Sequence, residues 1–385
     1  MSTLEVKIVK IEILPHDNAE RLELAQIGGP GGYICVVAKG QFKSGDLAIY
    51  IPSDSVIPDR MVAKISETSK IKLDNRIRAI KIRGVFSEGL CLKPSEWLLG
   101  DPKLQKEGDD VTLLLGVTKY EPPPPSWHGG IKSGKGINFN YVNPNFPEYW
   151  CVEHLKKYPK VLVESDEVVA TIKWHGTNFR AGLVRRPKTK GWWNKVKEFF
   201  TRPGEFEYLV GSHEKIKKLS VNAIEYGGRE TDTYWRAADK YKLEDITKKL
   251  SEVWFGPSNP SEVIIYAEIV GPGIQKGYDY GVDNGELEIR VFDIMVNKKY
   301  QDWDTVIDVC RQCDLPTVQE VYRGPYNQDI RKLSNAVDEY NGKKYVREGI
   351  VVRPLIEKKD PHCGRVIFKY LNEVYLLDKT NSEYH

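Results

Sequence analysis

The sequence predicts two domains of different fold class, a small all-β barrel or sandwich followed by a larger α+β domain with antiparallel sheets. Short alternating segments dominate the first hundred residues, a segment rich in proline and glycine follows, and helical and strand patterns mix after it. At 385 residues, the chain is long enough for two hydrophobic cores. We expect the domains to span 1–118 and 151–385, with a linker over 119–150.

The first domain is predicted from strands with a period of two. Residues 4–13 read LEVKIVKIEI, in which apolar and polar residues alternate. Similar runs recur at 33–40, 46–54, 76–84 and 89–94. Glycine-containing turns separate these runs at short intervals, which suits a small barrel or sandwich better than a βαβ unit.

The linker and the second domain are predicted from a change in composition. Residues 119–150 include PPPP and HGGIKSGKG, which favour little regular structure. Beyond them, residues 232–253 have the spacing of an amphipathic helix. Strand patterns occur at 161–174, 261–271, 286–296, 347–354 and 365–371. This mixture predicts an α+β domain with antiparallel sheets.

Composition excludes several classes of protein. No segment approaches the roughly 18 continuous apolar residues of a membrane helix, and the first residues alternate like a strand, unlike a secretory signal. We therefore expect a cytoplasmic protein with no membrane partner. Only Cys310 and Cys313 have the spacing of metal ligands. Because no second pair completes a site, two ordinary thiols at a helix end are favoured.

The charge pattern marks one candidate surface for RNA. A net charge of +3 permits nucleic-acid binding but is too weak to argue for it alone. From Arg185 to Lys218, however, ten lysines and arginines face four glutamates, and tryptophans and phenylalanines lie among them. RNA contact and a solvated hairpin with a short amphipathic helix explain this segment equally well. The candidate RNA-binding lysines are Lys188, Lys190, Lys195 and Lys197.

The segment KWHGTNFR, 173–180, places a lysine where a strand gives way to a glycine-containing turn. Such a loop end directs the amine of Lys173 into a cleft, and Gly176 allows close approach of the backbone. Asn178 and Arg180 lie on one face of the resumed strand and offer hydrogen bonds to phosphate or ribose oxygens. These groups suit a nucleotide, although a solvated strand-end lysine explains Lys173 equally well.

Four further motifs follow in order: YAEIVG at 266–271, LEIRVFDI at 287–294, REGIVVRP at 347–354 and VIFKYLN at 366–372. With KWHG, this series resembles the collinear motifs of the covalent nucleotidyltransferase superfamily, which comprises polynucleotide ligases and mRNA capping enzymes. The resemblance implies an ATP-grasp-like ligase fold for the second domain. It also implies that Lys173 attacks the α-phosphorus of a nucleotide, forming a lysyl–nucleotide and releasing pyrophosphate.

The resemblance also implies roles for the later motifs. Glu268 and Glu348 are expected to contact the waters of a Mg²⁺ or Mn²⁺ ion and the ribose, and Lys369 is expected to disfavour the charged form of Lys173. Phe292 either stacks on the purine or packs in the core. The implied catalytic residues are Lys173, Lys369, Glu268 and Glu348, and the implied nucleotide-binding residues are Lys173, Gly176, Asn178, Arg180, Glu268, Phe292 and Lys369.

The sequence departs from the superfamily pattern at three places. His175 stands where many relatives have aspartate, and a neutral imidazole there could orient a metal-bound water but could not supply charge. The lysine strand commonly carries two lysines, whereas Ile367 and Leu371 flank Lys369, so Lys369 acts alone or with Lys344 or Arg365. The pair Ser212 and His213 replaces serine and arginine, which puts a phosphate or RNA contact at Ser212 in doubt.

The arrangement of the whole chain is similar to that of one ligase family. Only sixteen residues follow Lys369, which leaves no room for the C-terminal OB module of DNA ligases and capping enzymes. The N-terminal domain instead resembles OB-type RNA-binding domains, and residues 78–90 resemble the segment that closes this module in the fifth RNA ligase family. That family combines an N-terminal OB-like domain with a C-terminal ligase domain.

The implied function is ATP-dependent sealing of RNA ends that bear a 3′-hydroxyl and a 5′-phosphate, such as nicks in a duplex. The reaction would proceed through a lysyl-AMP and an adenylylated RNA 5′ end. Arg83 is the best single candidate for RNA contact in the OB-like domain, against an equal alternative that it only closes the barrel. We expect a monomer. The alternatives are an mRNA guanylyltransferase and a non-catalytic RNA-binding protein with a relict ligase domain.

Overall fold

The computed structural model describes residues 4–69, 73–98, 106–120, 141–187, 205–217, 229, 232–255 and 260–378. Most of the predicted linker and the lysines at 188, 190, 195 and 197 lie outside the described residues. Within the described ranges, no helix is long and apolar enough to cross a membrane.

The N-terminal domain is a nearly closed antiparallel barrel, as predicted. Its main sheet has the order β3-β2-β1-β4-β9, from strands Lys7–Pro15 (β1), Leu22–Ile27 (β2), Tyr33–Ala38 (β3), Leu47–Pro52 (β4) and Gly89–Leu92 (β9). The backbone N–H of Glu88 donates to the carbonyl of Ile34 at 2.8 Å and so joins the β9 end to β3. Apolar residues of β1 and β4, including Ile8 and Ile49, are fully buried.

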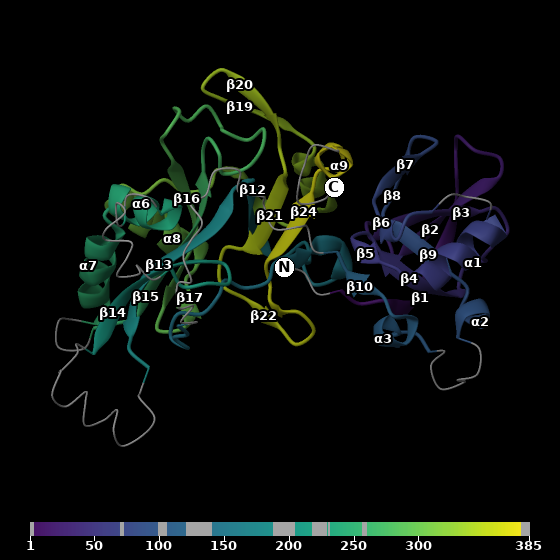
Figure 1. The fold of residues 1–385 in the computed structure, drawn as a ribbon, viewed down its shortest axis with the longest axis horizontal. Helices are drawn as coiled ribbons and strands as arrows, with labels where there is room; N and C mark the ends of the chain where they lie inside the picture. The colour runs from purple at the N-terminus through teal and green to yellow at the C-terminus, as the bar shows by residue number, and fades with distance from the viewer. Residues whose placement is uncertain are drawn as a thin grey trace, which may run out of the picture.

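Smaller elements complete this domain (Figure 1). A three-stranded sheet has the order β10-β5-β6, from Ser55–Val56 (β5), Arg76–Ile77 (β6) and Thr118–Lys119 (β10). Strands Ile80–Ile82 (β7) and Val85–Ser87 (β8) form a hairpin. The helices of this domain are Asp59–Ser69 (α1), Pro94–Trp97 (α2) and Thr112–Leu115 (α3).

The second domain contains two five-stranded sheets and has the predicted α+β class. The first sheet has the order β11-β24-β21-β12-β18, from Glu153–His154 (β11), Glu167–Lys173 (β12), Glu320–Pro325 (β18), Gly349–Pro354 (β21) and Phe368–Leu371 (β24). The second has the order β14-β13-β15-β16-β17, from Thr177–Arg185 (β13), Phe206–Ser212 (β14), Val263–Val270 (β15), Glu288–Val296 (β16) and Lys299–Tyr300 (β17). Because β12 leads directly into β13, residues 174–176 join the two sheets.

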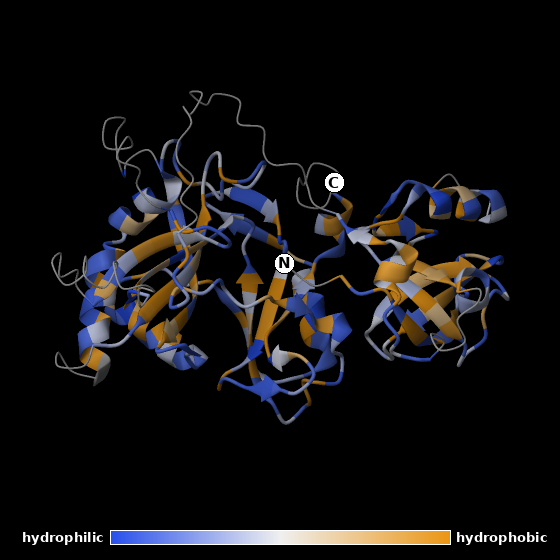
Figure 2. Cartoon of the chain, turned by 60° about the horizontal axis from the view of Figure 1, so that its bottom comes forward, coloured by the Kyte–Doolittle hydropathy of each residue, from blue (hydrophilic) through white to orange (hydrophobic). Residues whose placement is uncertain are grey.

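Helices and short hairpins surround these sheets. Helices α6 (Thr233–Lys240), α7 (Leu243–Phe255) and α8 (Trp303–Gln312) pack on the second sheet, and α9 (Glu373–Leu377) follows β24. Figure 2 shows hydrophobic residues gathered on the strands of both domains. The remaining elements are two 3₁₀ helices, Leu155–Lys157 (η1) and Gln328–Ser334 (η3), and the hairpins Val337–Tyr340 (β19) with Lys343–Val346 (β20) and Lys359–Asp360 (β22) with Gly364–Arg365 (β23).

The single helix predicted over 232–253 is wrong, because the structure divides it into α6 and α7. Helix α6 begins at an N-cap, where the Asp232 carboxylate accepts from the backbone N–H groups of Tyr234 and Trp235. Between the helices, Lys242 has a φ of 51°, a left-handed conformation that ends a helix. The period of 3.6 continues across this break because both helices bury an apolar face, so the pattern alone does not reveal it.

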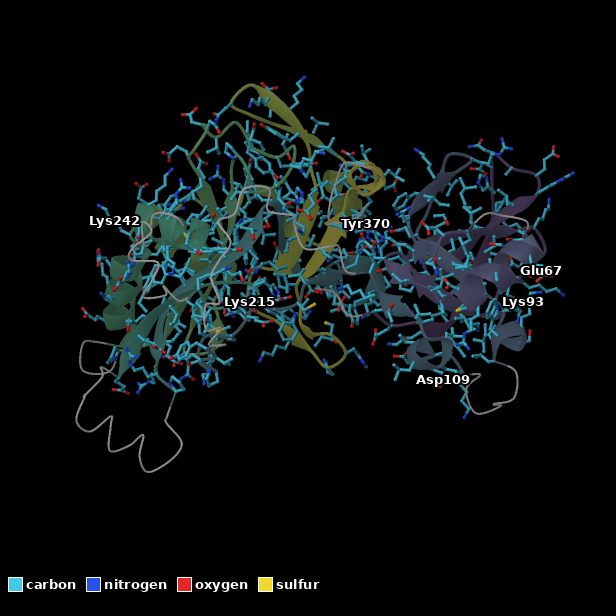
Figure 3. The ribbon with its side chains drawn as sticks, in the orientation of Figure 1. Glu67, Lys93, Asp109, Lys215, Lys242 and Tyr370 are labelled. Carbon is cyan, nitrogen blue, oxygen red and sulfur yellow. The ribbon has the colours of Figure 1, made fainter. Side chains whose placement is uncertain are left out.

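The two domains are in direct contact through buried groups. Lys156 of η1 forms an ion pair with Glu88 of the barrel, and both side chains are almost completely buried. Arg331 of η3 donates from Nη1 to the carbonyl of Gly31 at 2.6 Å. The His154 ring lies between Tyr33 of the barrel and Tyr370 of β24, at centroid distances of 5.8 Å and 5.1 Å. Figure 3 shows Tyr370 on the side of the second domain that faces the barrel.

Candidate active site

Lys173 lies at the end of β12, where the two sheets of the second domain meet. In the β12–β21 register, Lys173 is opposite Gly349, so the residue before Gly349, Glu348, lies beside the lysine. The Lys173 Nζ atom is 2.5 Å from Glu348 Oε1. The Glu348 side chain is fully buried, whereas 28% of the Lys173 side chain is exposed. The sequence-predicted lysine and one predicted carboxylate are thus in direct contact.

The three residues after Lys173 are each anchored by groups distant in the sequence. The Trp174 ring packs on Tyr280 and Tyr340, at centroid distances of 4.5 Å and 4.7 Å. The backbone N–H of His175 donates to Tyr280 Oη at 2.8 Å. Gln275 Nε2 donates to the carbonyl of Gly176 at 2.9 Å. This loop, residues 173–176, is called the nucleophile loop below.

Gly176 is required by the close approach of the nucleophile loop to β15. A Cβ atom at this position would lie 2.2 Å from the carbonyl oxygen of Ile269 and 2.8 Å from Glu268 Cγ. The Glu268 side chain therefore passes directly over the loop. In the β13–β15 register, Glu268 is also opposite Asn178. The Asn178 Oδ1 atom is buried and has no hydrogen-bond partner among the described residues. The structure thus brings Glu268, Asn178 and the loop together.

Lys369 lies on β24, next to β21, and is half-buried. Burial lowers the pKa of its ammonium group, and the positive charge of Lys173 lowers it further, against the opposing effect of Glu348. Both lysines line one cleft of about 1320 Å³ that extends between the second domain and the barrel. Lysines outnumber carboxylates among the residues that line this cleft. An anionic ligand is therefore the natural occupant.

His175 is buried among tyrosines. Its Nδ1 atom lies 2.9 Å from Tyr375 Oη, and its ring packs edge-on against Tyr278 at a centroid distance of 4.8 Å. The described part of the chain contains no group of three His, Cys, Asp or Glu residues placed to hold a metal ion. A role for His175 beside a metal-bound water stays a prediction, and its observed role is to connect the nucleophile loop to α9.

Arg180 and Phe292 lie farther along the second sheet. Arg180 is buried, and its Nη1 atom donates to the carbonyl of Phe146 at 3.1 Å. Asn178 and Arg180 alternate with the buried Phe179 on β13, so they share a face, as expected. Phe292 lies at a register shift between β15 and β16 and contacts the Tyr149 ring edge-on at 4.8 Å. It is half-buried, and stacking on a purine stays a prediction for it.

The candidates to assist Lys369 have other positions. Arg365 is buried in an ion-pair network, with its Nη2 atom 2.6 Å from Asp293 Oδ2 and its Nε atom 2.8 Å from Glu357 Oε2. Lys344 is exposed on the β19–β20 hairpin. Ile367 is buried in the core. A guanidinium that already neutralises two carboxylates has little charge left for a phosphate, which favours Lys369 acting without Arg365.

The described candidates for RNA contact lie away from Lys173. Arg83 and Gly84 form the two-residue turn of the β7–β8 hairpin, and both have positive φ, as a turn of this length favours. The Arg83 side chain is exposed and points away from the barrel core. Ser212 ends β14, where its Oγ accepts from the backbone N–H of Lys215 at 3.2 Å. RNA contact at both residues stays a prediction.

Sequence reasoning missed the tyrosines that support the nucleophile loop. Tyr278 and Tyr280 come from the segment 271–287 and Tyr375 from α9, so they meet His175 only through the fold. The sequence YDYG at 278–281 concentrates aromatic residues in a turn, which is unusual for a solvated loop and was the available signal.

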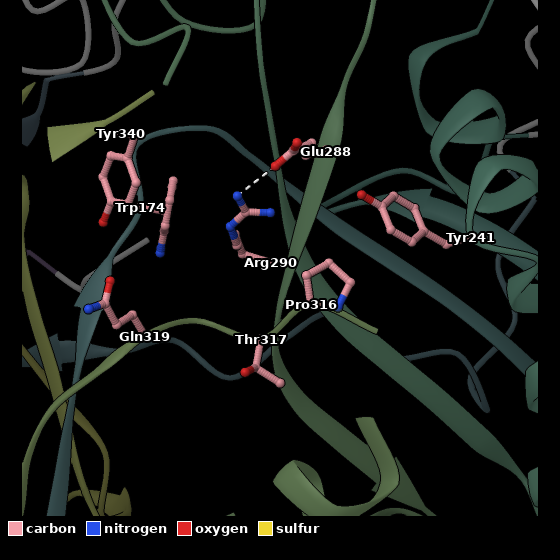
Figure 4. Close-up of a pocket in the computed structure, with 8 residues that line it drawn as sticks. All are labelled: Trp174, Tyr241, Glu288, Arg290, Pro316, Thr317, Gln319 and Tyr340. Atoms are coloured by element: carbon pink, nitrogen blue, oxygen red, sulfur yellow. Dashed lines mark hydrogen bonds and ion pairs between the residues drawn. The ribbon is translucent and has the colours of Figure 1, made fainter. Parts of the chain in front are cut away.

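A second, separate pocket of about 500 Å³ lies beside Trp174. Figure 4 shows Trp174, Tyr340 and Gln319 on one side of it and Tyr241 on the other, with the Arg290–Glu288 ion pair between them. The Arg290 guanidinium lies 4.6 Å from the centroid of the Trp174 ring. The Trp174 Nε1 atom is buried and finds no hydrogen-bond partner in the described ranges. Lys173 lines the interdomain cleft, and Trp174 lines this pocket.

Comparisons with known proteins agree with this site and fold. A sequence model of the RNA ligase family matches residues 166–371, and one of an OB-fold domain matches residues 3–94. Similar solved structures include Naegleria gruberi RNA ligase with PPi, at 20% identity and a TM-score of 0.66, with 97% of this chain and 98% of that chain covered. A single-residue mutant of the same ligase with AMP and Mn has 21% identity, a TM-score of 0.66 and the same coverage.

Another mutant of that ligase, with ATP and Mn, has 20% identity and a TM-score of 0.65, with 96% of this chain and 98% of that chain covered. No curated protein matched the chain. The likeness to the solved structures establishes the fold, and the family match covers more than half of the sequence, including Lys173, Glu268, Glu348 and Lys369. The chain belongs to the RNA ligase family.

Proposed function

We propose that this protein is an ATP-dependent RNA ligase that joins a 3′-hydroxyl to a 5′-phosphate, with nicks in a duplex as its substrates. In the first step, Lys173 Nζ attacks the α-phosphorus of ATP, forms a phosphoramidate with AMP and releases pyrophosphate. AMP then passes to the RNA 5′-phosphate, and attack by the 3′-hydroxyl releases it. The observation that carries this proposal is the meeting of Lys173, Glu348 and Lys369 at one cleft.

The residues around the nucleophile loop fit a nucleotide. The glycine at 176 keeps the loop backbone within van der Waals distance of β15, and the buried Oδ1 of Asn178 has an unused acceptor among the described residues. A ribose hydroxyl is a donor that could satisfy this acceptor. Solved structures of a ligase with the same fold, titled with ATP and Mn or with AMP and Mn, support ATP as the nucleotide.

Two carboxylates fit a divalent metal ion. Glu348 and Glu268 lie on either side of the nucleophile loop, and hard oxygen ligands suit Mg²⁺ and Mn²⁺, commonly through retained waters. When bound, the ion would supply positive charge to the phosphates, which stabilises a phosphoryl-transfer transition state. Glu348 also orients the Lys173 amine, because its oxygen is the direct partner of Nζ.

Lys369 supplies a second, fixed positive charge to the same cleft. Lys173 and Lys369 each disfavour the other's charged form, since the repulsion between two ammonium groups is mutual. This matters because an unperturbed lysine, with a pKa of about 10.4, is almost wholly protonated at neutral pH and cannot attack in that form. Lys369 would also stabilise the charge on the non-bridging oxygens of the α-phosphate.

The barrel is proposed to hold RNA over this site. The cleft that contains both lysines continues along β1 of the barrel, where Lys10 is exposed and its side chain is available to a phosphate. Contacts of this kind follow the backbone of a nucleic acid and are independent of sequence. The RNA 5′-phosphate would thereby be placed between the barrel and Lys173.

Labelling with α-labelled nucleotides tests this function. The protein, incubated with a divalent metal and either ATP or GTP, should form a covalent, acid-labile adduct with ATP only. An adduct with GTP only would make the protein a guanylyltransferase. Absence of an adduct with either nucleotide would favour the non-catalytic RNA-binding alternative. Sealing of a nicked duplex with a 3′-hydroxyl and a 5′-phosphate then tests the substrate.

A further inference from the structure

The short helix α9 begins directly after the strand that carries Lys369, and its first residues are fixed to Glu348. Asn372 caps the helix, with its side chain accepting from the backbone N–H of Val374 at 2.8 Å. The backbone N–H of Asn372 donates to the carbonyl of Glu348 at 2.9 Å. Asn372 is only 2% exposed. The position of α9 is therefore set by the residue that contacts Lys173.

One turn farther on, Tyr375 reaches the nucleophile loop. Its side chain is completely buried, and its Oη atom lies 2.9 Å from Nδ1 of His175. The Tyr375 ring packs edge-on against His175 and Tyr278, at centroid distances of 5.4 Å and 6.0 Å. Both rings are buried, so the tyrosine–histidine hydrogen bond is shielded from water and its loss is not made good by solvent.

These contacts connect both partners of the Lys173–Glu348 pair to a single helical turn. Asn372 holds the backbone of Glu348, and Tyr375 holds His175, which is two residues beyond Lys173. Lys369 precedes Asn372 by three residues on the same segment. A displacement of α9 would therefore change the distances among the three groups that we place around the α-phosphate.

We propose that Tyr375 is a positioning residue, which holds the nucleophile loop through His175 in the geometry that Lys173 needs for attack on the nucleotide. This inference rests on the proposed function. It concerns the adenylylation step alone, because Lys173 is the nucleophile only there. Sealing of an RNA that already carries AMP on its 5′ end needs no lysine nucleophile and should be far less sensitive to the loop.

The test is Tyr375→Phe, which keeps the ring and removes the hydroxyl. Single-turnover formation of lysyl-AMP is measured over a range of ATP concentrations, and sealing of chemically pre-adenylylated RNA is measured with the same preparation. The maximal rate of adenylylation should fall about tenfold, in line with the cost of misplacing a reacting group. The half-saturating ATP concentration and the sealing rate should stay within about twofold of the unmutated protein. Val374→Ala, on the exposed side of the same helix, is the matched control and should change neither rate.

The ratio of the two rates decides the outcome. Because both reactions use one preparation, this ratio does not depend on the fraction of folded protein, so partial unfolding of the variant cannot imitate the expected result. A ratio equal to that of the unmutated protein, whether both rates are normal or both fall together, overturns the positioning role. If the unmutated protein forms no adduct with ATP, the proposed function itself fails, and that result is distinct from both.

Discussion

Replacement of Glu88 by glutamine tests the buried contact between the two domains. The ion pair of Glu88 with Lys156 has side-chain exposures of 5% and 8%, so the variant leaves the Lys156 ammonium buried without its counter-ion. Loss of one partner of a buried pair costs about 3 to 5 kcal/mol. The rings of Tyr33, Phe86 and Tyr370 lie 5.2 to 5.9 Å from Lys156 Nζ and retain part of its stabilisation.

We therefore expect Glu88→Gln to lower the free energy of unfolding by about 3 kcal/mol, near the lower end of the range for buried pairs. The assay is urea unfolding followed by circular dichroism, with the midpoints compared between variants. The matched control is Glu5→Gln, which breaks a second interdomain pair, Glu5 with Lys157 at 2.7 Å. That pair is partly exposed, so its loss should cost about 0 to 1 kcal/mol.

A double variant separates the cost of an unpaired charge from the value of the pair. Glu88→Leu combined with Lys156→Met replaces the ion pair by apolar groups and should recover most of the stability lost in Glu88→Gln. Equal midpoints for Glu88→Gln and Glu5→Gln would refute the reasoning, because they would mean that Lys156 is not held in a buried, water-free contact.

Two further predictions concern the site and the RNA surface. Gly176→Ala should reduce adenylylation by a hundredfold or more, on the order of the loss from an ångström-scale misplacement, because the added Cβ would lie 2.2 Å from the carbonyl oxygen of Ile269; adenylylation near the original rate would show that β15 can move aside. Neutralising the four lysines of the basic segment should weaken RNA binding and lower the slope of log affinity against log salt by about 0.7 to 0.9 per lost phosphate contact, and an unchanged slope would exclude that segment from RNA binding; these lysines are Lys188, Lys190, Lys195 and Lys197.

The strands of both domains were predictable because they alternate between core and solvent. Residues 4–13 and 286–296 became β1 and β16 within a few residues, since a buried face leaves a period of two in the sequence. The break between α6 and α7 was not predictable in the same way. It depends on the left-handed backbone of Lys242, a residue type that gives no sign of this conformation.

The candidate site was predictable where chemistry follows order along the chain. The contact between Lys173 and Glu348 joins two motifs that lie 175 residues apart in the sequence, and the motif order alone suggested it. The surroundings of these groups were not predictable. Contacts such as Tyr375 with His175, and the ion pairs of Arg365, join side chains whose sequence neighbours carry no shared pattern, so only the folded chain reveals them.

The central claim is that Lys173 carries AMP, and the most direct measurement compares two reactions of Lys173→Ala. The variant should form no acid-labile adduct with α-labelled ATP, yet should seal chemically pre-adenylylated RNA at a measurable rate, because the last step uses the 3′-hydroxyl as nucleophile. Lys344→Ala, which removes an exposed lysine on the β19–β20 hairpin, is the matched control and should be labelled like the unmutated protein. Persistent acid-labile label on Lys173→Ala would contradict the account, because another lysine would then carry the nucleotide.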